Sequence, residues 1–172
     1  MIQKRRCATY VGRSQTFSSV MTDPVMFSSQ QSEWETPQEL FEHLHKKYKF
    51  TVDAAASIFN AKLPRFWSKE NNGLAQNWEG ERVWLNPPYG RGSQSCAPWV
   101  KKAALTKNCF VMMLLPARTD TGWWHDYVQP YAKNVEFIRG RLRFEGGLYP
   151  APFPSVLVIF NSTGHSSDQT DG

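Results

Sequence analysis

A β-α-β pattern between residues 82 and 115 constrains the fold of this chain more than any other feature. Residues 82–85 are a short apolar run that leads directly into Asn86-Pro87-Pro88-Tyr89-Gly90. Prolines cannot donate the hydrogen bonds of a sheet, so the strand predicted over 82–85 must end there. A helix with proline near its start is predicted over 97–105, and 109–115 is a continuous apolar run of strand length. The pattern predicts parallel strands joined by a helical crossover.

The alternation of helix and strand continues on both sides of this unit. A helix is predicted from Thr36 to Tyr48, because a threonine N-cap, a proline at the first position and an acidic first turn come together. The other predicted elements are strands over 50–53, 135–138 and 155–160 and a helix over 122–131. This order predicts an α/β fold with a mostly parallel sheet flanked by helices, in which the last strand is a candidate for an antiparallel position.

The composition predicts one globular domain over residues 31–162. The chain has 172 residues, of which 41% are hydrophobic, enough for one core. Residues 1–30 are rich in polar side chains and are predicted to form a flexible arm, and residues 163–172 a disordered tail. Between Asp53 and Asn86 lie only thirty-two residues, fewer than two βα units need, so we expect an abbreviated first half of the sheet.

Charge and cysteine content narrow the function classes. The net charge of +5 favours a polyanionic partner, although many basic proteins bind no nucleic acid. No run reaches the roughly eighteen apolar residues of a membrane span. The three cysteines, Cys7, Cys96 and Cys109, lack a zinc-binding spacing, which indicates reduced thiols and no metal site. We therefore expect a cytoplasmic protein without membrane association.

The segment Asn86-Pro87-Pro88-Tyr89 carries the most specific chemistry. Ligands collect beyond the carboxyl ends of strands in α/β sheets, and this segment follows the strand predicted over 82–85. The Asn86 side-chain carbonyl and the Pro87 main-chain carbonyl are acceptors for the hydrogens of a planar amino group, which localises the nitrogen lone pair for attack. Pro88 makes the loop rigid, and Tyr89 supplies a ring face for stacking on a base that has left the duplex. The alternative is a rigid turn with its tyrosine packed on the surface.

Several further segments join this motif in a family resemblance. They are Glu33-Trp34-Glu35-Thr36-Pro37, Asp53-Ala54-Ala55-Ala56-Ser57, Asn60-Ala61-Lys62, Asn72-Gly73-Leu74, Gly140-Arg141-Leu142-Arg143-Phe144 and Pro152-Phe153-Pro154-Ser155. Over about residues 26–161 the chain resembles the phage and prophage Dam-like DNA N-6-adenine methyltransferase family. The resemblance implies a Rossmann-like methyltransferase sheet, S-adenosylmethionine as methyl donor, double-stranded DNA as partner and a phage or prophage origin. The family pattern has proline at position 54 and an acid at position 72, so we assign no cofactor role to Asn72.

The sequence indicates the cofactor-binding residues less clearly, because the chain has no Gly-x-Gly-x-x-Gly turn. Asp53 is expected to accept from the cofactor's ammonium or ribose, with a helix N-cap as the alternative. Ala54 and Ala55 permit close approach of a ligand to the backbone. The remaining cofactor candidates are Thr36 and Pro37 at the methionine end, with helix capping as the alternative for Thr36, then Glu70 at the ribose, and Asn86.

Candidate DNA-binding residues are Tyr89 and the arginines Arg91, Arg118 and Arg141, each of which has a solvated surface charge as its alternative. Two other functions stay open. The same motif serves enzymes that methylate RNA or protein glutamine, and a decayed methyltransferase scaffold would be a noncatalytic DNA-binding module. The sequence leaves open the recognition sequence, the oligomeric state, and whether the biological role is restriction evasion, as in restriction-modification, or regulation.

Overall fold

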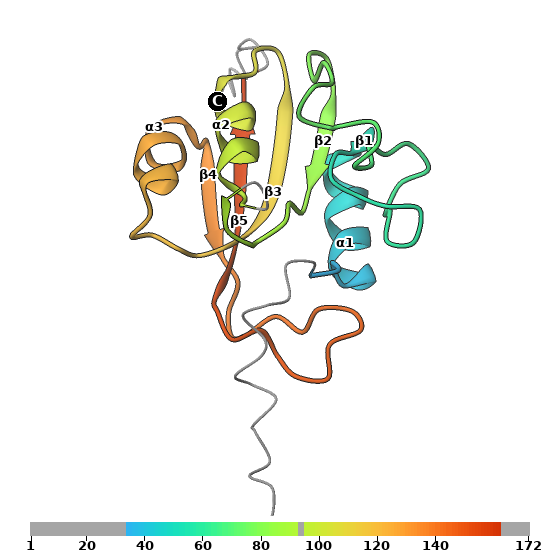
Figure 1. Ribbon diagram of the computed structural model, residues 1–172, viewed down its shortest axis with the longest axis vertical. Coiled ribbons are helices and arrows are strands. Elements are labelled where there is room, and N and C mark those ends of the chain that lie inside the picture. The colour runs from blue at the N-terminus through green and yellow to red at the C-terminus, as the bar shows by residue number, and fades with distance from the viewer. Residues whose placement is uncertain (1–33, 93–94, 163–172) are drawn as a thin grey trace, which may run out of the picture.

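The computed structural model describes residues 34–92 and 95–162, in which five strands form one sheet (Figure 1). The strands are β1 (Val52–Asp53), β2 (Arg82–Leu85), β3 (Phe110–Pro116), β4 (Asn134–Phe137) and β5 (Ser155–Asn161). Their order across the sheet is β1-β2-β3-β5-β4. Each predicted strand is confirmed to within about two residues. The arm predicted over 1–30 and the tail predicted over 163–172 lie outside the described residues.

The sheet is mixed. β1, β2 and β3 are parallel, and β5 is antiparallel to both of its neighbours, β3 and β4. The mostly parallel sheet is therefore confirmed only in part, whereas the antiparallel last strand is confirmed. A parallel last strand would need a crossover connection after β4, usually a helix. Residues 138–154 contain no helix and return the chain directly into β5.

Helices cover the sheet as predicted, with two corrections. They are α1 (Gln38–Tyr48), α2 (Ala97–Leu105) and a last helical segment made of the π-helix η3 (Trp124–Val128) and α3 (Gln129–Tyr131). α1 begins after Pro37, which takes the N-cap position without a side-chain hydrogen bond, so the prediction that Thr36 caps this helix is wrong. The helix predicted over 122–131 has a π-turn at its centre. No helix in the described part of the chain is long and apolar enough to span a membrane.

Two apolar clusters fill the spaces above and below the sheet. Strand side chains point to opposite faces in turn, and alternate residues of β2, β3 and β5 accordingly enter different clusters. One cluster packs against α2 and η3 and contains Val83, Leu85, Val111, Met113, Val156 and Val158. The other packs against α1 and contains Trp84, Phe110, Met112, Leu114 and Leu157. Burial on both faces fixes the position of the strand ends that carry the candidate site.

The connection between β1 and β2 is irregular. Residues 54–81 are all described and contain turns and one isolated bridge, from Phe66 to Asp53, but no helix or strand element. Backbone bonds from Asp53 N to Arg65 O (3.1 Å) and from Trp67 N to Asp53 O (2.8 Å) hold the segment against β1. An irregular loop, and no βα unit, therefore connects β1 to β2.

Candidate active site

A pocket of about 450 Å³ opens where β1 and β2 end. Its walls come from residues 34–36, from the loop after β1, from residues 67–74, and from the segment Trp84 to Pro88 with Trp99 behind it. This edge of an α/β sheet is the usual place for ligands. The volume falls in the range of small-molecule and cofactor sites.

The pocket gathers about half of the residues that the sequence singled out. Those on its walls are Thr36, Asp53, Ala55, Glu70, Asn86, Pro87 and Pro88. Those outside its walls are Pro37, Ala54, Tyr89, Arg91, Arg118 and Arg141. The cofactor candidates from three separate segments and the candidate catalytic loop therefore share one cavity. The predicted DNA contacts are not among the residues that line it.

Asn86 is held in one orientation by its amide hydrogens. Its Nδ2 donates to the Trp34 carbonyl oxygen at 2.5 Å and to the Thr36 hydroxyl oxygen at 3.0 Å. A carbonyl oxygen can only accept, so the nitrogen end of the amide must face Trp34. The Oδ1 end then accepts from the Tyr89 hydroxyl at 2.7 Å and keeps one lone pair for another donor. The amide is a fixed acceptor on the pocket wall.

Tyr89 is placed differently from the sequence interpretation. Its side chain is only 3% exposed, and its ring contacts Phe144 and Phe153 edge-on, at centroid distances of 6.2 and 5.6 Å. The ring therefore lies in the core beside the pocket and presents no face to it. The hydroxyl, to which the sequence assigned no role, reaches both Asn86 Oδ1 and the Leu114 carbonyl oxygen, the latter at 2.8 Å. Burial holds the pKa of this phenol well above its usual value, and the Arg118 charge offsets this only in part.

Asp53 is a buried carboxylate at the pocket wall. It is 4% exposed, and burial raises its pKa to about 6, although backbone N–H groups of Lys62 and Ala55 and the Lys62 charge act in the opposite direction. Lys62 N donates to Oδ2 at 3.0 Å. No helix begins after Asp53, so the alternative of a helix N-cap is wrong. The carboxylate instead joins β1 to the loop that borders the pocket.

The backbone at Ala54 is approached closely by the chain itself, at Gly73. A Cβ placed on Gly73 would overlap the Ala54 carbonyl oxygen, so only glycine fits there. The Gly73 carbonyl in turn accepts from Trp78 Nε1 at 2.9 Å. Nearby, the exposed Glu70 accepts from the Ser68 hydroxyl, which lowers its pKa. Both segments line the same wall.

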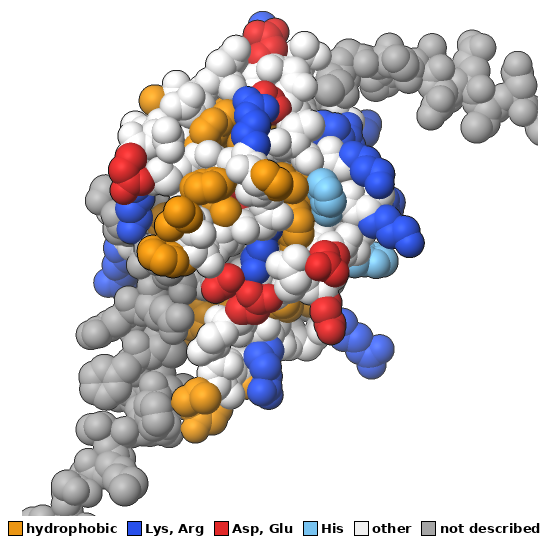
Figure 2. All heavy atoms as spheres, turned by 90° about the vertical axis from the view of Figure 1, so that its right-hand side faces the viewer, with side chains coloured by type: hydrophobic (Ala, Val, Ile, Leu, Met, Phe, Trp, Pro, Cys, Tyr) orange, Lys and Arg blue, Asp and Glu red, His pale blue; other side chains and the backbone are white. Residues whose placement is uncertain are grey.

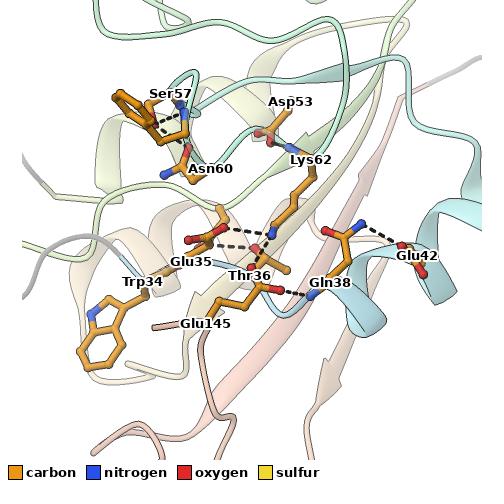
Figure 3. A network of polar contacts seen from close by, with 12 residues as sticks. Trp34, Glu35, Thr36, Gln38, Glu42, Asp53, Ser57, Asn60, Lys62 and Glu145 are labelled. Carbon is orange, nitrogen blue, oxygen red and sulfur yellow. Dashed lines mark hydrogen bonds and ion pairs between the residues drawn. The ribbon is translucent and has the colours of Figure 1, made fainter. Parts of the chain in front are cut away.

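A buried lysine network at the pocket escaped the sequence analysis (Figure 3). Lys62 Nζ bonds to Glu35 Oε1 at 3.2 Å and to Glu145 Oε2 at 2.8 Å, and its side chain is 6% exposed. Glu145 Oε1 also accepts from Gln38 N at the start of α1. These contacts join segments up to 107 positions apart. Lys62 and Glu35 both lie in segments that carry the family resemblance, but the sequence alone does not show that they contact each other.

The exposed turn after β1 also escaped the sequence analysis. Ile58 and Phe59 are 79% and 93% exposed, and Phe59 lines the pocket. Asn60 Oδ1 fixes the turn by accepting from the Ser57 N–H at 2.7 Å and from its hydroxyl at 3.0 Å. Figure 2 shows hydrophobic side chains gathered beside acidic ones on the side of the molecule that carries this turn. An ordered, fully exposed phenylalanine at a pocket rim is a stacking surface for a planar ligand.

The candidate DNA-binding arginines fall in three places. Arg91 is exposed after the Asn86 to Tyr89 loop, and Arg141 is exposed in the loop between β4 and β5. Arg118 is half-buried after β3, close enough for its charge to lower the pKa of the Cys96 thiol, which burial raises to about 11. Its charge also lowers the pKa of Tyr89, so Arg118 lies near the end of the Asn86 to Tyr89 loop.

Comparisons with known proteins place the chain in one family. A family described as DNA N-6-adenine-methyltransferase (Dam) matches residues 25–171. The chain is 39% identical over 106 residues to a DNA N-6-adenine-methyltransferase of Escherichia phage T1, which covers 59% of this chain and 43% of that protein. It is 28% identical over 157 residues to a protein of the same name from Haemophilus phage HP1 (strain HP1c1), covering 88% of this chain and 80% of that protein. The first match thus spans less than half of the T1 protein.

Proposed function

Because the chain belongs to the DNA N-6-adenine-methyltransferase (Dam) family, we propose that it transfers a methyl group from S-adenosylmethionine to the exocyclic amino group of adenine in double-stranded DNA. The observation that carries the proposal is the Asn86 amide. It is held on the pocket wall with its oxygen end fixed and one acceptor position left over. The relatives named above are phage proteins, which supports a phage or prophage origin and action in the cytoplasm of a bacterial cell.

The pocket residues fit this cofactor. The carboxylate of Asp53 is buried and lines the pocket together with Thr36 and Glu70, so it is suited to an ammonium or ribose hydroxyl. Phe59 offers a ring face for the adenine of a bound nucleoside. When bound, S-adenosylmethionine supplies an electrophilic methyl carbon attached to a positively charged sulfur. These residues would bind and orient it.

The catalytic role falls to the loop after β2. An adenine amino group is a weak nucleophile because its lone pair is delocalised into the ring. Asn86 Oδ1 and the Pro87 carbonyl oxygen would accept its two hydrogens, which localises that lone pair on the nitrogen. Pro87 and Pro88 keep the two acceptors in fixed relation. The methylated amino group then loses its extra proton to water, so no dedicated base is needed.

The substrate adenine must leave the base stack, at a cost of a few kcal/mol. Arg91, Arg118 and Arg141 are proposed to bind the DNA around it, where phosphate contacts fix orientation without reading sequence. For Tyr89 to stack on the base, its ring would have to leave the contacts with Phe144 and Phe153, so we propose that it acts first by holding Asn86.

The fold supports a Rossmann-like methyltransferase arrangement with an abbreviated first half. β1, β2 and β3 are parallel, the pocket lies at the carboxyl ends of β1 and β2, and the antiparallel β5 lies between β3 and β4. The basic net charge and the family favour DNA over RNA or protein glutamine as the acceptor. The intact Asn86 to Tyr89 loop argues against a noncatalytic DNA-binding module.

Transfer of a labelled methyl group to unmethylated plasmid DNA, RNA and protein, run in parallel, tests the function. We expect label only in DNA, recovered as N6-methyladenine after digestion. Calorimetric titration with S-adenosylmethionine, in the absence of DNA, separates an enzyme from a noncatalytic module. Label in RNA or protein alone, or no heat of cofactor binding, would overturn the proposal.

A further inference from the structure

We propose that the loop between β4 and β5, residues 138–154, is an arm that binds the DNA duplex and inserts an apolar tip between base pairs. The inference rests on the proposed function, because it takes double-stranded DNA as the partner. In Figure 1 this loop, drawn in orange, extends beyond the end of the sheet. Its basic flank, its fixed base and its exposed tip each support the inference.

The flank of the arm presents arginines on one side. Along residues 141–144 exposed and covered side chains alternate: Arg141 and Arg143 are exposed, Leu142 is half-buried and Phe144 is 2% exposed. Residues two apart in extended chain point the same way. Arg141 and Arg143 therefore face outward together, while Leu142 and Phe144 pack against the core cluster on the α1 side.

The base of the arm is fixed to the pocket wall. Glu145 N donates to the Glu35 carbonyl oxygen at 3.0 Å, and the Glu145 carboxylate accepts from Lys62 and from Gln38 N. Where the loop returns toward β5, Ala151 N donates to the Leu142 carbonyl oxygen at 2.8 Å. The only carboxylate in the loop is thus engaged inward (Figure 3), so the charge that the arm presents outward is positive.

The tip of the arm is apolar and exposed. Leu148 is 84% exposed and Tyr149 is 59% exposed, and they follow Gly146, whose φ of +72° is a turn conformation that favours glycine. An ordered loop that exposes two large apolar side chains between a basic flank and the bulk solvent has the composition of a wedge. Proteins that distort DNA place apolar side chains between base steps in this way, with arginines on the neighbouring phosphates.

The arm also shares its support with the candidate catalytic loop. Trp34 packs against Phe144 and Phe153, at ring distances of 5.3 and 5.2 Å, and its carbonyl oxygen accepts from Asn86. A wedge on this support would unstack the duplex close to the pocket that must receive an extruded base. This placement favours a DNA duplex over other polyanions, because only a base-paired partner offers a step to open.

The first experiment measures how many phosphates the two arginines contact. Binding of the full chain to a fluorescent duplex is followed by anisotropy over a series of salt concentrations. Arg141→Gln/Arg143→Gln should weaken binding and lower the slope of log affinity against log salt by about 2. The matched control is Lys101→Gln/Lys107→Gln, which removes two exposed cations from α2 and the turn after it and should leave the slope unchanged. An unchanged slope in the arginine variant would overturn the proposal that Arg141 and Arg143 contact DNA phosphates.

The second experiment measures whether the tip of the loop inserts between base pairs. Closed circular plasmid is relaxed by a topoisomerase in the presence of saturating protein, and the topoisomers are read after protein removal. Wild-type protein should leave unwound DNA, and Leu148→Ala/Tyr149→Ala should leave little, although it still binds. Leu105→Ala, at a 50% exposed site in α2, is the control and should unwind as the wild type does. Equal unwinding by the tip variant, or none by wild type, would overturn the wedge.

Labelled methyl transfer in the same samples separates this inference from the proposed function. Unwinding without methylation would refute the proposed methyltransferase activity but would still support insertion of the loop into DNA. If both hold, the tip variant should methylate at least about tenfold more slowly than wild type, because the base must then unstack unaided. Full methylation by the tip variant would refute the wedge and leave the enzyme standing.

Discussion

At the scale of single residues, Asn86 shows how one amide is both fixed and left available. Asn86→Ala is expected to lower turnover by about a hundred- to a thousandfold, because one aligned acceptor is typically worth about 3 to 4 kcal/mol to the transition state. Steady-state methyl transfer measures the loss, and calorimetry should show nearly unchanged cofactor affinity. Asn134→Ala is the control and should keep wild-type turnover, since it truncates an exposed asparagine of β4 that does not line the pocket. More than a tenth of wild-type turnover in Asn86→Ala would contradict the assignment.

Tyr89 tests whether a ring or a hydroxyl matters. The sequence interpretation assigned stacking to the ring, which predicts that Tyr89→Phe keeps most activity. The structure gives the hydroxyl a partner at Asn86 Oδ1, so we now expect Tyr89→Phe to lower turnover about tenfold without changing cofactor affinity. Turnover and calorimetry on the same preparation measure both. Wild-type turnover in Tyr89→Phe together with a large loss in Tyr89→Ala would restore the stacking interpretation.

At the scale of elements, the sequence predicted what depends on near neighbours. The helix over 97–105 has the predicted bounds, and the strands agree closely, because apolar periodicity and proline positions are local signals. The role of Thr36 could not be predicted from its neighbours in sequence, because its hydroxyl accepts a hydrogen bond from Asn86, fifty positions away. The burial of Tyr89 depends in the same way on Phe144 and Phe153. Contacts between distant segments therefore decided which predicted site residues line the pocket.

The loop between β1 and β2 depends on one glycine. Gly73→Ala should lower the free energy of unfolding by about 1 to 3 kcal/mol, since the new Cβ meets the Ala54 carbonyl oxygen and the Trp99 ring. Cofactor affinity should fall as well, because Gly73 lines the pocket. Chemical denaturation and calorimetry measure the two effects. Gly122→Ala is the control, with only Asp126 Oδ2 near its Cβ at 3.9 Å. Equal free energies of unfolding for the two variants would show that the loop around Gly73 accommodates the added Cβ without loss of stability.

At the scale of the whole molecule, the buried carboxylate of Asp53 links folding to pH. Its pKa is about 6 in the folded protein against 3.8 for an exposed aspartate, so folding takes up a proton between these values. Stability from this group is therefore present below about pH 4 and is lost as pH rises through 6, by about 3 kcal/mol. Asp53→Asn should thus gain stability relative to wild type between pH 4 and pH 7.5, measured by denaturation at each pH. A constant difference would contradict the shift.

The same proton reports on the cofactor. A bound cation beside Asp53 favours the ionised form, so wild-type protein at pH 6 should release up to about half a proton on binding S-adenosylmethionine, the fraction that is protonated at that pH. Titration calorimetry in buffers with different ionisation enthalpies counts this proton, and Asp53→Asn should show none from this site. Affinity in the wild type should also fall by up to about tenfold per unit below pH 6, because the proton must first leave. Equal proton release in both proteins would place the cofactor's charge away from Asp53, whatever the loss in affinity.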